Sequence, residues 1–133
     1  MRRIIFILFS LSLFFFGCED KPGEGGQASI QGKVYVKYFP ENCVQLLDSF
    51  YGVDEEVYII AGDDPSYFER VRTGPDGTFW FPYLRTGNYQ VYALSEVCSD
   101  IPTDKLEAIT VDVKINDRKE DIVLPDIEVI RLR

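Results

Sequence analysis

The sequence contains no histidine at any of its 133 positions. Histidine is the usual general base of serine and cysteine hydrolases and the commonest zinc ligand, so its absence excludes the familiar forms of both kinds of site. Hydrolysis by paired carboxylates, as in glycosidases, and calcium binding by oxygen ligands alone stay open. We therefore expect a protein that is not an enzyme and that uses no cofactor or metal.

Basic residues are also scarce, since 14 lysines and arginines stand against 22 aspartates and glutamates. Arg2 and Arg3 lie in the N-terminal segment described next, which leaves the rest of the chain with 12 basic and 22 acidic residues, a net charge of −10. A field of this sign repels nucleic acid and anionic lipid headgroups. Nucleic acid is therefore not an expected partner.

The sequence lacks an apolar run of about 20 residues, the length that a transmembrane helix needs. The N-terminus instead has Arg2 and Arg3, then an apolar run over residues 4–16, then Gly17. A basic start, an apolar stretch of about a dozen residues and a small residue before the cleavage site are typical of a secretory signal. We predict that residues 1–17 form this signal.

The end of the signal has a motif of its own, Phe15-Phe16-Gly17-Cys18. It resembles the lipobox of bacterial lipoproteins, although Phe15 stands where leucine is usual. The resemblance implies that Cys18 becomes the N-terminus and carries acyl chains of the palmitate type, and two or three such chains anchor a protein stably. It also implies a lipoprotein outside the cytoplasm, anchored to the bacterial outer membrane on its periplasmic face or at the cell surface.

The residues after Cys18 are predicted to be a lipidated, flexible tether over 18–28. Glu19-Asp20 fits a surface-export signal, an inner-membrane retention signal or an ordinary polar linker, and all three interpretations stay open. Residues 22–27 are rich in glycine and lack apolar side chains, a composition typical of flexible linkers. The folded domain is expected over 29–133, which is enough chain for one core.

The expected domain is dominated by a period of two. Ile30, Val34 and Val36 alternate with Lys33 and Lys37, the pattern of a half-buried strand. Seven strands are predicted, over residues 30–38, 56–61, 68–73, 78–81, 89–94, 108–115 and 122–132. Their spacing predicts an all-β, antiparallel Greek-key β-sandwich. Residues 42–51 are the exception, because their apolar spacing also fits a short helix.

Two motifs in the middle of the chain are more specific. They are Asp76-Gly77-Thr78-Phe79-Trp80-Phe81 and Leu84-Arg85-Thr86-Gly87-Asn88-Tyr89-Gln90-Val91. With the opening strand 30–34, they resemble the carboxypeptidase regulatory-like domain, a prealbumin-like β-sandwich related to the CnaB and transthyretin folds. The resemblance implies a hairpin at Asp76-Gly77, a positive φ at Gly87, and core positions for Phe79, Phe81 and Tyr89.

The same resemblance implies little about function, because such domains serve as spacers, stalks and adhesive or assembly modules. This chain departs from the family pattern by an insert at residues 39–55. A self-formed isopeptide bond, which some CnaB domains contain, is not expected, because residues 127–133 include no asparagine. Hydroxyisourate hydrolases share the broad fold but depend on histidines that this chain lacks.

Cys43 and Cys98 are the two cysteines that remain once Cys18 is acylated. An even pair in an oxidising compartment is typical of a disulfide. If successive strands alternate in direction, the loops after the first and fifth predicted strands lie at the same end of the sandwich, and these loops contain Cys43 and Cys98. We predict a disulfide between them, with two free thiols as the alternative.

Other candidate sites are weaker. Residues 63–66, Asp-Asp-Pro-Ser, come nearest to a calcium loop, but their spacing fits no defined motif and we interpret them as an acidic turn. Four aromatic residues are predicted on faces opposite the core: Tyr35, Tyr58, Trp80 and Tyr92. Such a row can stack on sugar rings, although outward aromatics more often cover the edge of a core or contact a neighbouring domain.

Two functions follow from these features. The first is a lipid-anchored interaction or structural module of the cell envelope, without catalytic activity, whose partners are the membrane through Cys18 and another envelope protein. The alternative is a lipoprotein that binds a glycan or small ligand through the exposed aromatics and the insert at residues 39–55.

Overall fold

The computed structural model describes residues 21–101 and 103–133, and in this range it contains nine strands and no helix. The strands are β1 (Glu24–Phe39), β2 (Asp48–Tyr51), β3 (Glu56–Ala61), β4 (Glu69–Arg72), β5 (Thr78–Leu84), β6 (Gly87–Glu96), β7 (Leu106–Ile115), β8 (Asp121–Val123) and β9 (Ile127–Leu132). None of the described residues belongs to a helix long and apolar enough to cross a membrane. The all-β prediction is confirmed.

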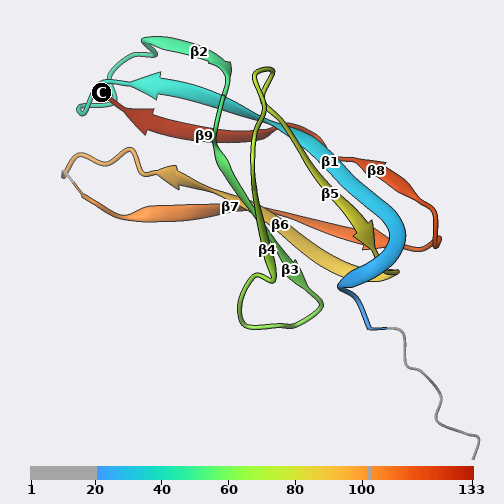
Figure 1. Ribbon diagram of the computed structural model, residues 1–133. Helices are drawn as coiled ribbons and strands as arrows, with labels where there is room; N and C mark the ends of the chain where they lie inside the picture. The colour runs from blue at the N-terminus through green and yellow to red at the C-terminus, as the bar shows by residue number, and fades with distance from the viewer. Residues whose placement is uncertain (1–20, 102) are drawn as a thin grey trace, which may run out of the picture.

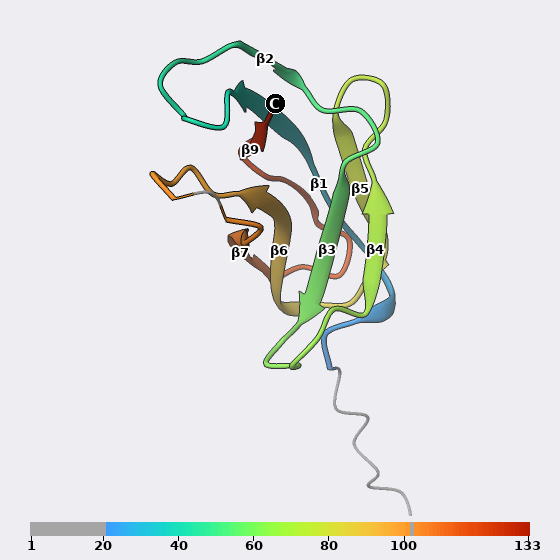
Figure 2. The ribbon, with the colours of Figure 1, turned by 90° about the vertical axis from the view of Figure 1, so that its left-hand side faces the viewer.

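The strands form two sheets that pack as a sandwich (Figures 1 and 2). In the first sheet, the long β1 pairs with β2 and β5 along one side and with β8 and β9 along the other. The second sheet has the order β4-β3-β6-β7, and all its neighbours are antiparallel. The predicted β-sandwich is thus present, with β1 as the central strand of one layer.

The core lies between the inner faces of the two sheets, and the alternation in sequence explains which side chains reach it. On β1, Ile30, Val34 and Val36 are fully buried, whereas the intervening lysines face outward. On β5, Phe79 and Phe81 are buried as predicted. The largest fully buried side chains come from both sheets: Tyr89, Phe79, Phe81, Ile30, Ile59, Leu84, Ile115 and Ile127.

Two glycines of the predicted motifs have a specific conformational role. Gly77 has φ 80° and closes the turn before β5, where its amide donates to the carbonyl of Gly74 at 3.0 Å. Gly87 has φ 139° at the start of β6. Both φ values lie in a region that favours glycine, so the predicted turn at residues 76–77 and the predicted positive φ at residue 87 are confirmed.

The prediction of seven antiparallel strands is wrong in two respects. The described residues form nine strands, because the last predicted stretch divides at Pro125 into β8 and β9, and because β2 forms within residues 42–51, whose apolar spacing also fits a short helix. In addition, β8 and β9 run parallel to β1. The reason is that β7 ends at the same end of the sandwich where β1 begins, so the chain returns to the first sheet in the direction of β1.

The prediction of a flexible tether through residue 28 is wrong for its last part. Strand β1 begins at Glu24, and Ala28 is fully buried. The amide of Gly23 donates to the Tyr89 hydroxyl at 2.7 Å, and the amide of Arg85 donates to the Gly23 carbonyl at 2.9 Å. Glycine makes this docking possible, because a Cβ on Gly26 would lie 2.0 Å from the carbonyl oxygen of Leu84.

The loops and both termini of the described chain lie at two opposite ends of the sandwich. The described chain begins at the end that holds the 62–68, 85–86 and 116–120 connections. The other end holds the loops 40–47 and 97–105 and the C-terminus (Figure 1). The predicted insert therefore lies far from the point at which the chain enters the domain.

Candidate interaction site

A disulfide between Cys43 and Cys98 closes the end of the sandwich remote from residue 21. The two Cα atoms are 5.8 Å apart, and the bond joins the loop after β1 to the loop after β6. The predicted pairing is confirmed. We call the described residues of the two joined loops, 40–47, 97–101 and 103–105, the clamped end.

The loop 40–47 is shaped by local hydrogen bonds. The amide of Cys43 donates to the carbonyl of Pro40 at 2.8 Å, and Cys43 itself has φ 54°, in the left-handed region. The amide of Val44 donates to the Asn42 side chain at 3.3 Å, and the amide of Leu47 donates to the Tyr38 carbonyl at 2.8 Å. These bonds form a tight turn whose apolar side chains are left outside the core.

Large apolar side chains gather at the clamped end without being covered. Val44 is 77% exposed and Ile101 is 75% exposed, and Leu46 and Leu47 are also exposed, as is Leu106 at the start of β7 just after the clamped end. Single exposed apolar residues are ordinary, but several on two cross-linked loops mark a contact surface. A depression of about 210 Å³ lies between the loops, with Ile101 and Leu132 among its lining residues.

Acidic side chains accompany this apolar surface. Glu41, Glu96 and Asp104 line the same depression, and Asp100 is exposed on the same loop as Asp104. Lys105 is the one basic residue in the described part of the two loops. The clamped end thus combines exposed apolar groups with negative charge.

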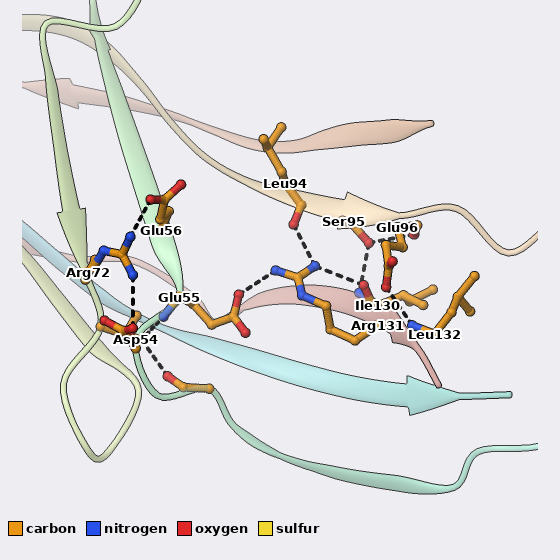
Figure 3. A network of polar contacts seen from close by, with 12 residues as sticks. Asp54, Glu55, Glu56, Arg72, Leu94, Ser95, Glu96, Ile130, Arg131 and Leu132 are labelled. Carbon is orange, nitrogen blue, oxygen red and sulfur yellow. Dashed lines mark hydrogen bonds and ion pairs between the residues drawn. The ribbon is translucent and has the colours of Figure 1, made fainter. Parts of the chain in front are cut away.

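Arg131 of β9 connects the two sheets next to the clamped end (Figure 3). Its guanidinium pairs with the Glu55 carboxylate, and it also donates to the carbonyls of Leu94 and Ile130 at 2.9 and 3.0 Å. Glu55 immediately precedes β3 of the second sheet and Arg131 belongs to β9 of the first, so the pair connects the two layers. A single arginine side chain thereby satisfies three acceptors between the sheets.

The free side of β9 is covered by side chains from β6. The amide of Ile130 donates to the Ser95 hydroxyl at 2.8 Å, and the amide of Leu132 donates to the Glu96 carboxylate at 2.6 Å (Figure 3). Ser95 is buried and donates in turn to the carbonyl of Glu96. These bonds replace the partners that another strand would supply.

A polar groove of about 410 Å³ lies next to this network on the outer face of the second sheet. Arg72 joins Asp54 and Glu56 there, with both distances 2.9 Å (Figure 3). The Tyr58 hydroxyl donates to Glu56 at 2.7 Å, which lowers the pKa of the Glu56 carboxyl, and Arg70 and Arg72 lower it further. The same hydrogen bond raises the pKa of Tyr58. Glu56 is therefore held ionised, in a fixed surface of paired charges.

The four predicted surface aromatics lie on opposite faces of the molecule. Tyr35 and Trp80 belong to the outer face of the first sheet, and Trp80 is 54% exposed. Tyr58 and Tyr92 stack on the outer face of the second sheet, with ring centroids 4.9 Å apart and an interplanar angle of 9°. All four lie on outer faces of the sheets, but Tyr58 is buried there under other rings, and the four do not form one row.

Neighbouring aromatics cover part of the Tyr58 and Tyr35 rings. Tyr67 packs edge-on against Tyr58, which is 9% exposed, with centroids 4.9 Å apart. Tyr51 packs edge-on against Tyr35 at 5.2 Å. Tyr51 and Tyr67 were missed by the sequence prediction because they lie in the insert and in a loop, where no period of two identifies an outward face.

Other predicted sites are placed as follows. Residues 63–66 form part of the turn between β3 and β4, where the amide of Asp64 donates to the Ala61 carbonyl. Within 21–101 and 103–133, no group of three or more potential ligands is arranged to hold a metal ion. Cys18 and the predicted signal at 1–17 lie outside the described residues.

Comparison with known proteins gives a likeness in fold. No protein-family model matches the chain, and no curated protein matches it. Among solved structures, the chain is similar to a crystal structure from Pseudomonas aeruginosa called a "putative carbohydrate binding protein". The TM-score is 0.47 and the identity 14%, over 82% of this chain and 91% of that chain. This degree of similarity does not transfer a function.

Proposed function

We propose that this protein is a lipid-anchored module of the bacterial cell envelope that binds another envelope protein through its clamped end. The observation that carries the proposal is the disulfide between Cys43 and Cys98, which fixes two loops with exposed apolar side chains at one end of the domain. A cross-linked surface loses less conformational entropy on binding than a free loop does. The position of this end, opposite residue 21, suits a surface that faces away from an anchor.

The anchor itself is proposed on Cys18. The apolar run at residues 4–16 and the motif at 15–18 support it. The cysteine count supports it too, because Cys43 and Cys98 pair with each other and leave Cys18 as the odd cysteine, available for acylation. Mass spectrometry of the N-terminal peptide from cell membranes tests it. We expect a peptide that begins at Cys18 and carries acyl mass, and a Cys18→Ser variant that is released from outer-membrane fractions. An unmodified Cys18 would contradict the anchor without affecting the domain.

The proposed role is non-catalytic. The chain has no histidine, and the carboxylates of the polar groove are engaged by Arg72, Arg131 and the Tyr58 hydroxyl. Such groups form a rigid surface with paired charges, which suits recognition better than proton transfer.

Substitution of exposed apolar residues at the clamped end, with an exposed residue elsewhere as the control, tests the proposed binding surface directly. The double variant Val44→Ser/Ile101→Ser removes two of its most exposed apolar side chains. The control is Val123→Ser, since Val123 is 69% exposed on β8, near the other end. We expect the protein isolated from membranes after mild cross-linking to retain its partner in the control and to lose it in the double variant. Equal recovery in both would contradict the proposal.

We also propose that the domain is a Greek-key member of the carboxypeptidase regulatory-like, CnaB-type family. The turn at residues 76–77, the buried Phe79 and Phe81, and the buried Tyr89 support this assignment. The Tyr89 hydroxyl donates to the carbonyl of Arg85 at 2.7 Å and so fixes the corner before β6. A profile built from homologues tests the assignment. If it did not align Gly77, Gly87 and Tyr89 with the family motif, the assignment would be wrong.

Glycan binding is a second candidate, for which Trp80 is the supporting observation. Its ring is 54% exposed on the outer face of β5, opposite Gln31, and so offers an apolar surface beside a hydrogen-bonding amide. A glycan array with the intact protein and with Trp80→Ala tests this function. Binding that is lost in Trp80→Ala would support it, and an array without signal for the intact protein would exclude it.

A further inference from the structure

Strand β7 forms an edge of the second sheet with no neighbour on its outer side. It pairs with β6 over ten residues, from Leu106 to Ile115, and with no other strand of the described chain. Figure 2 shows β7 at the margin of the sheet, next to β6. Unpaired amides and carbonyls along a strand of this length are a template for another strand.

The other edges of the sandwich are each short or blocked. β4 and β2 have four residues each, and β5 contains Pro82, which has no amide hydrogen to donate. The amides on the free side of β9 are occupied by Ser95 and Glu96. Only β7, among the strands that the structure describes, offers a long edge without proline or a covering side chain.

We propose that β7 accepts an extended segment of the partner protein, with alternating apolar and basic side chains, as a fifth strand of the second sheet. This inference rests on the proposed function, because it identifies the chemistry of the partner that the clamped end holds. Main-chain hydrogen bonds would provide affinity, and alternate side chains would provide specificity.

The inner face of β7 is the reason to expect apolar side chains at every second position of the added segment. Ile109 and Val111 are only half-buried, although both pack on the core, because no strand covers their outer side. On the other face, Ala108, Thr110 and Asp112 are exposed. A strand added here would therefore place every second side chain against Ile109 and Val111, and the others in solvent beside Asp112.

Acidic side chains near β7 are the reason to expect basic side chains in the added segment. Asp112 is exposed on the outward face of β7, with Lys114 further along the same face, and Asp100 and Asp104 are exposed in the loop before β7, where Lys105 alone opposes them. Glu107 lies on the inner face ahead of Ile109, so the added segment would pair with β7 from Ala108 onward. The described residues as a whole carry 12 basic and 20 acidic side chains. Lysine or arginine in the incoming segment would be attracted to this edge, whereas acidic segments would be repelled.

Charge and register argue against a second copy of the chain as the occupant. Two acidic domains repel each other. If β7 paired with itself around Thr110, Glu107 would lie opposite the buried Val113, and around Val111 it would lie opposite the buried Ile115. Either register would desolvate a carboxylate against an apolar side chain, which is costly.

Amide hydrogen exchange of β7 in the intact disulfide-bonded domain tests the proposal. The probe is an end-blocked peptide in which valine alternates with lysine. The first control peptide has glutamate in place of lysine, and the second has proline at the central positions. We expect the valine–lysine peptide to slow exchange about tenfold at alternate β7 amides, and both controls to leave exchange unchanged.

Three results would overturn the proposal. One is unchanged exchange along β7 with the valine–lysine peptide, and another is equal protection by the glutamate peptide. Protection of β7 that appears without peptide as protein concentration rises would also overturn it, in favour of a second copy. The same measurement on Val44→Ser/Ile101→Ser separates the two ideas, because this variant leaves β7 intact. If the peptide protects β7 in this variant as it does in the parent protein, while membrane pull-downs recover the partner equally from this variant and from Val123→Ser, only the clamped-end proposal fails.

Discussion

Arg131, near the end of the last strand, forms an ion pair with Glu55, which immediately precedes the first strand of the second sheet. The two residues are 76 positions apart in the chain and belong to different layers of the sandwich. Their side chains are 27% and 16% exposed. The pair therefore links the layers at the base of the clamped end, where solvent screening is reduced.

We expect Arg131→Met to lower the free energy of unfolding by about 2 kcal/mol, because Glu55 would remain partly buried without its counter-charge. The matched control is Lys37→Met, which removes the more exposed pair between Lys37 and Glu128. That change should cost less than about 1 kcal/mol. Urea unfolding of the three proteins measures both values, and equal losses would show that the Arg131 pair has no special structural role.

Reduction of the disulfide between Cys43 and Cys98 should lower stability by about 4 kcal/mol, because the bond closes a loop of 55 residues in the unfolded chain. Urea midpoints with and without reductant measure the change. The reduced protein should keep its β-rich circular dichroism below the transition, since the bond joins loops outside the core. Two titratable thiols in the denatured, unreduced protein would contradict the bond itself.

Gly26→Ala should destabilise the domain by about 1–3 kcal/mol, because its Cβ would lie 2.0 Å from the backbone oxygen of Leu84 and would displace the start of β1. Gly74→Ala is the control, since the nearest atom to its Cβ would be 3.8 Å away. If the segment around Gly26 were a free tether, both variants would unfold at the same urea concentration.

Burial raises the pKa of the Glu69 carboxyl above its ordinary value, and the neighbouring Glu24 raises it further. The folded state therefore favours the protonated form, so the contribution of Glu69 to stability is lost as pH rises through the raised folded-state pKa. We expect Glu69→Gln to be slightly more stable than the parent protein at neutral pH, and to match it below about pH 4. Denaturation across this pH range, with the exposed Glu107→Gln as control, measures the difference. A larger gain in acid than at neutrality would contradict the prediction.

Features that depend on local sequence were predictable. The alternation around Val34 identified β1, and the Asp76-Gly77 pair identified a turn, because each is determined by neighbours along the chain. The disulfide was predictable for a different reason, since Cys43 and Cys98 are the only cysteines left for each other once Cys18 is assigned elsewhere.

Features that depend on pairing between distant segments were not predictable. Alternation shows that Tyr35 and Tyr58 point away from the core, but it does not show that their strands belong to different sheets. The parallel pairing of β9 with β1 and the contact between Glu55 and Arg131 likewise have no local signal. The docking of Gly26 against Leu84 was missed because a glycine-rich segment fits a linker as well as a close backbone contact.

Site-specific photo-cross-linking in intact cells tests the central claim most directly. A photoreactive amino acid would replace Val44 or Ile101 at the clamped end, or Val123 as the exposed control on β8. The account predicts that the first two positions give a cross-link to the same envelope protein, while position 123 gives none. The absence of any cross-link from positions 44 and 101, or an identical pattern from position 123, would contradict it.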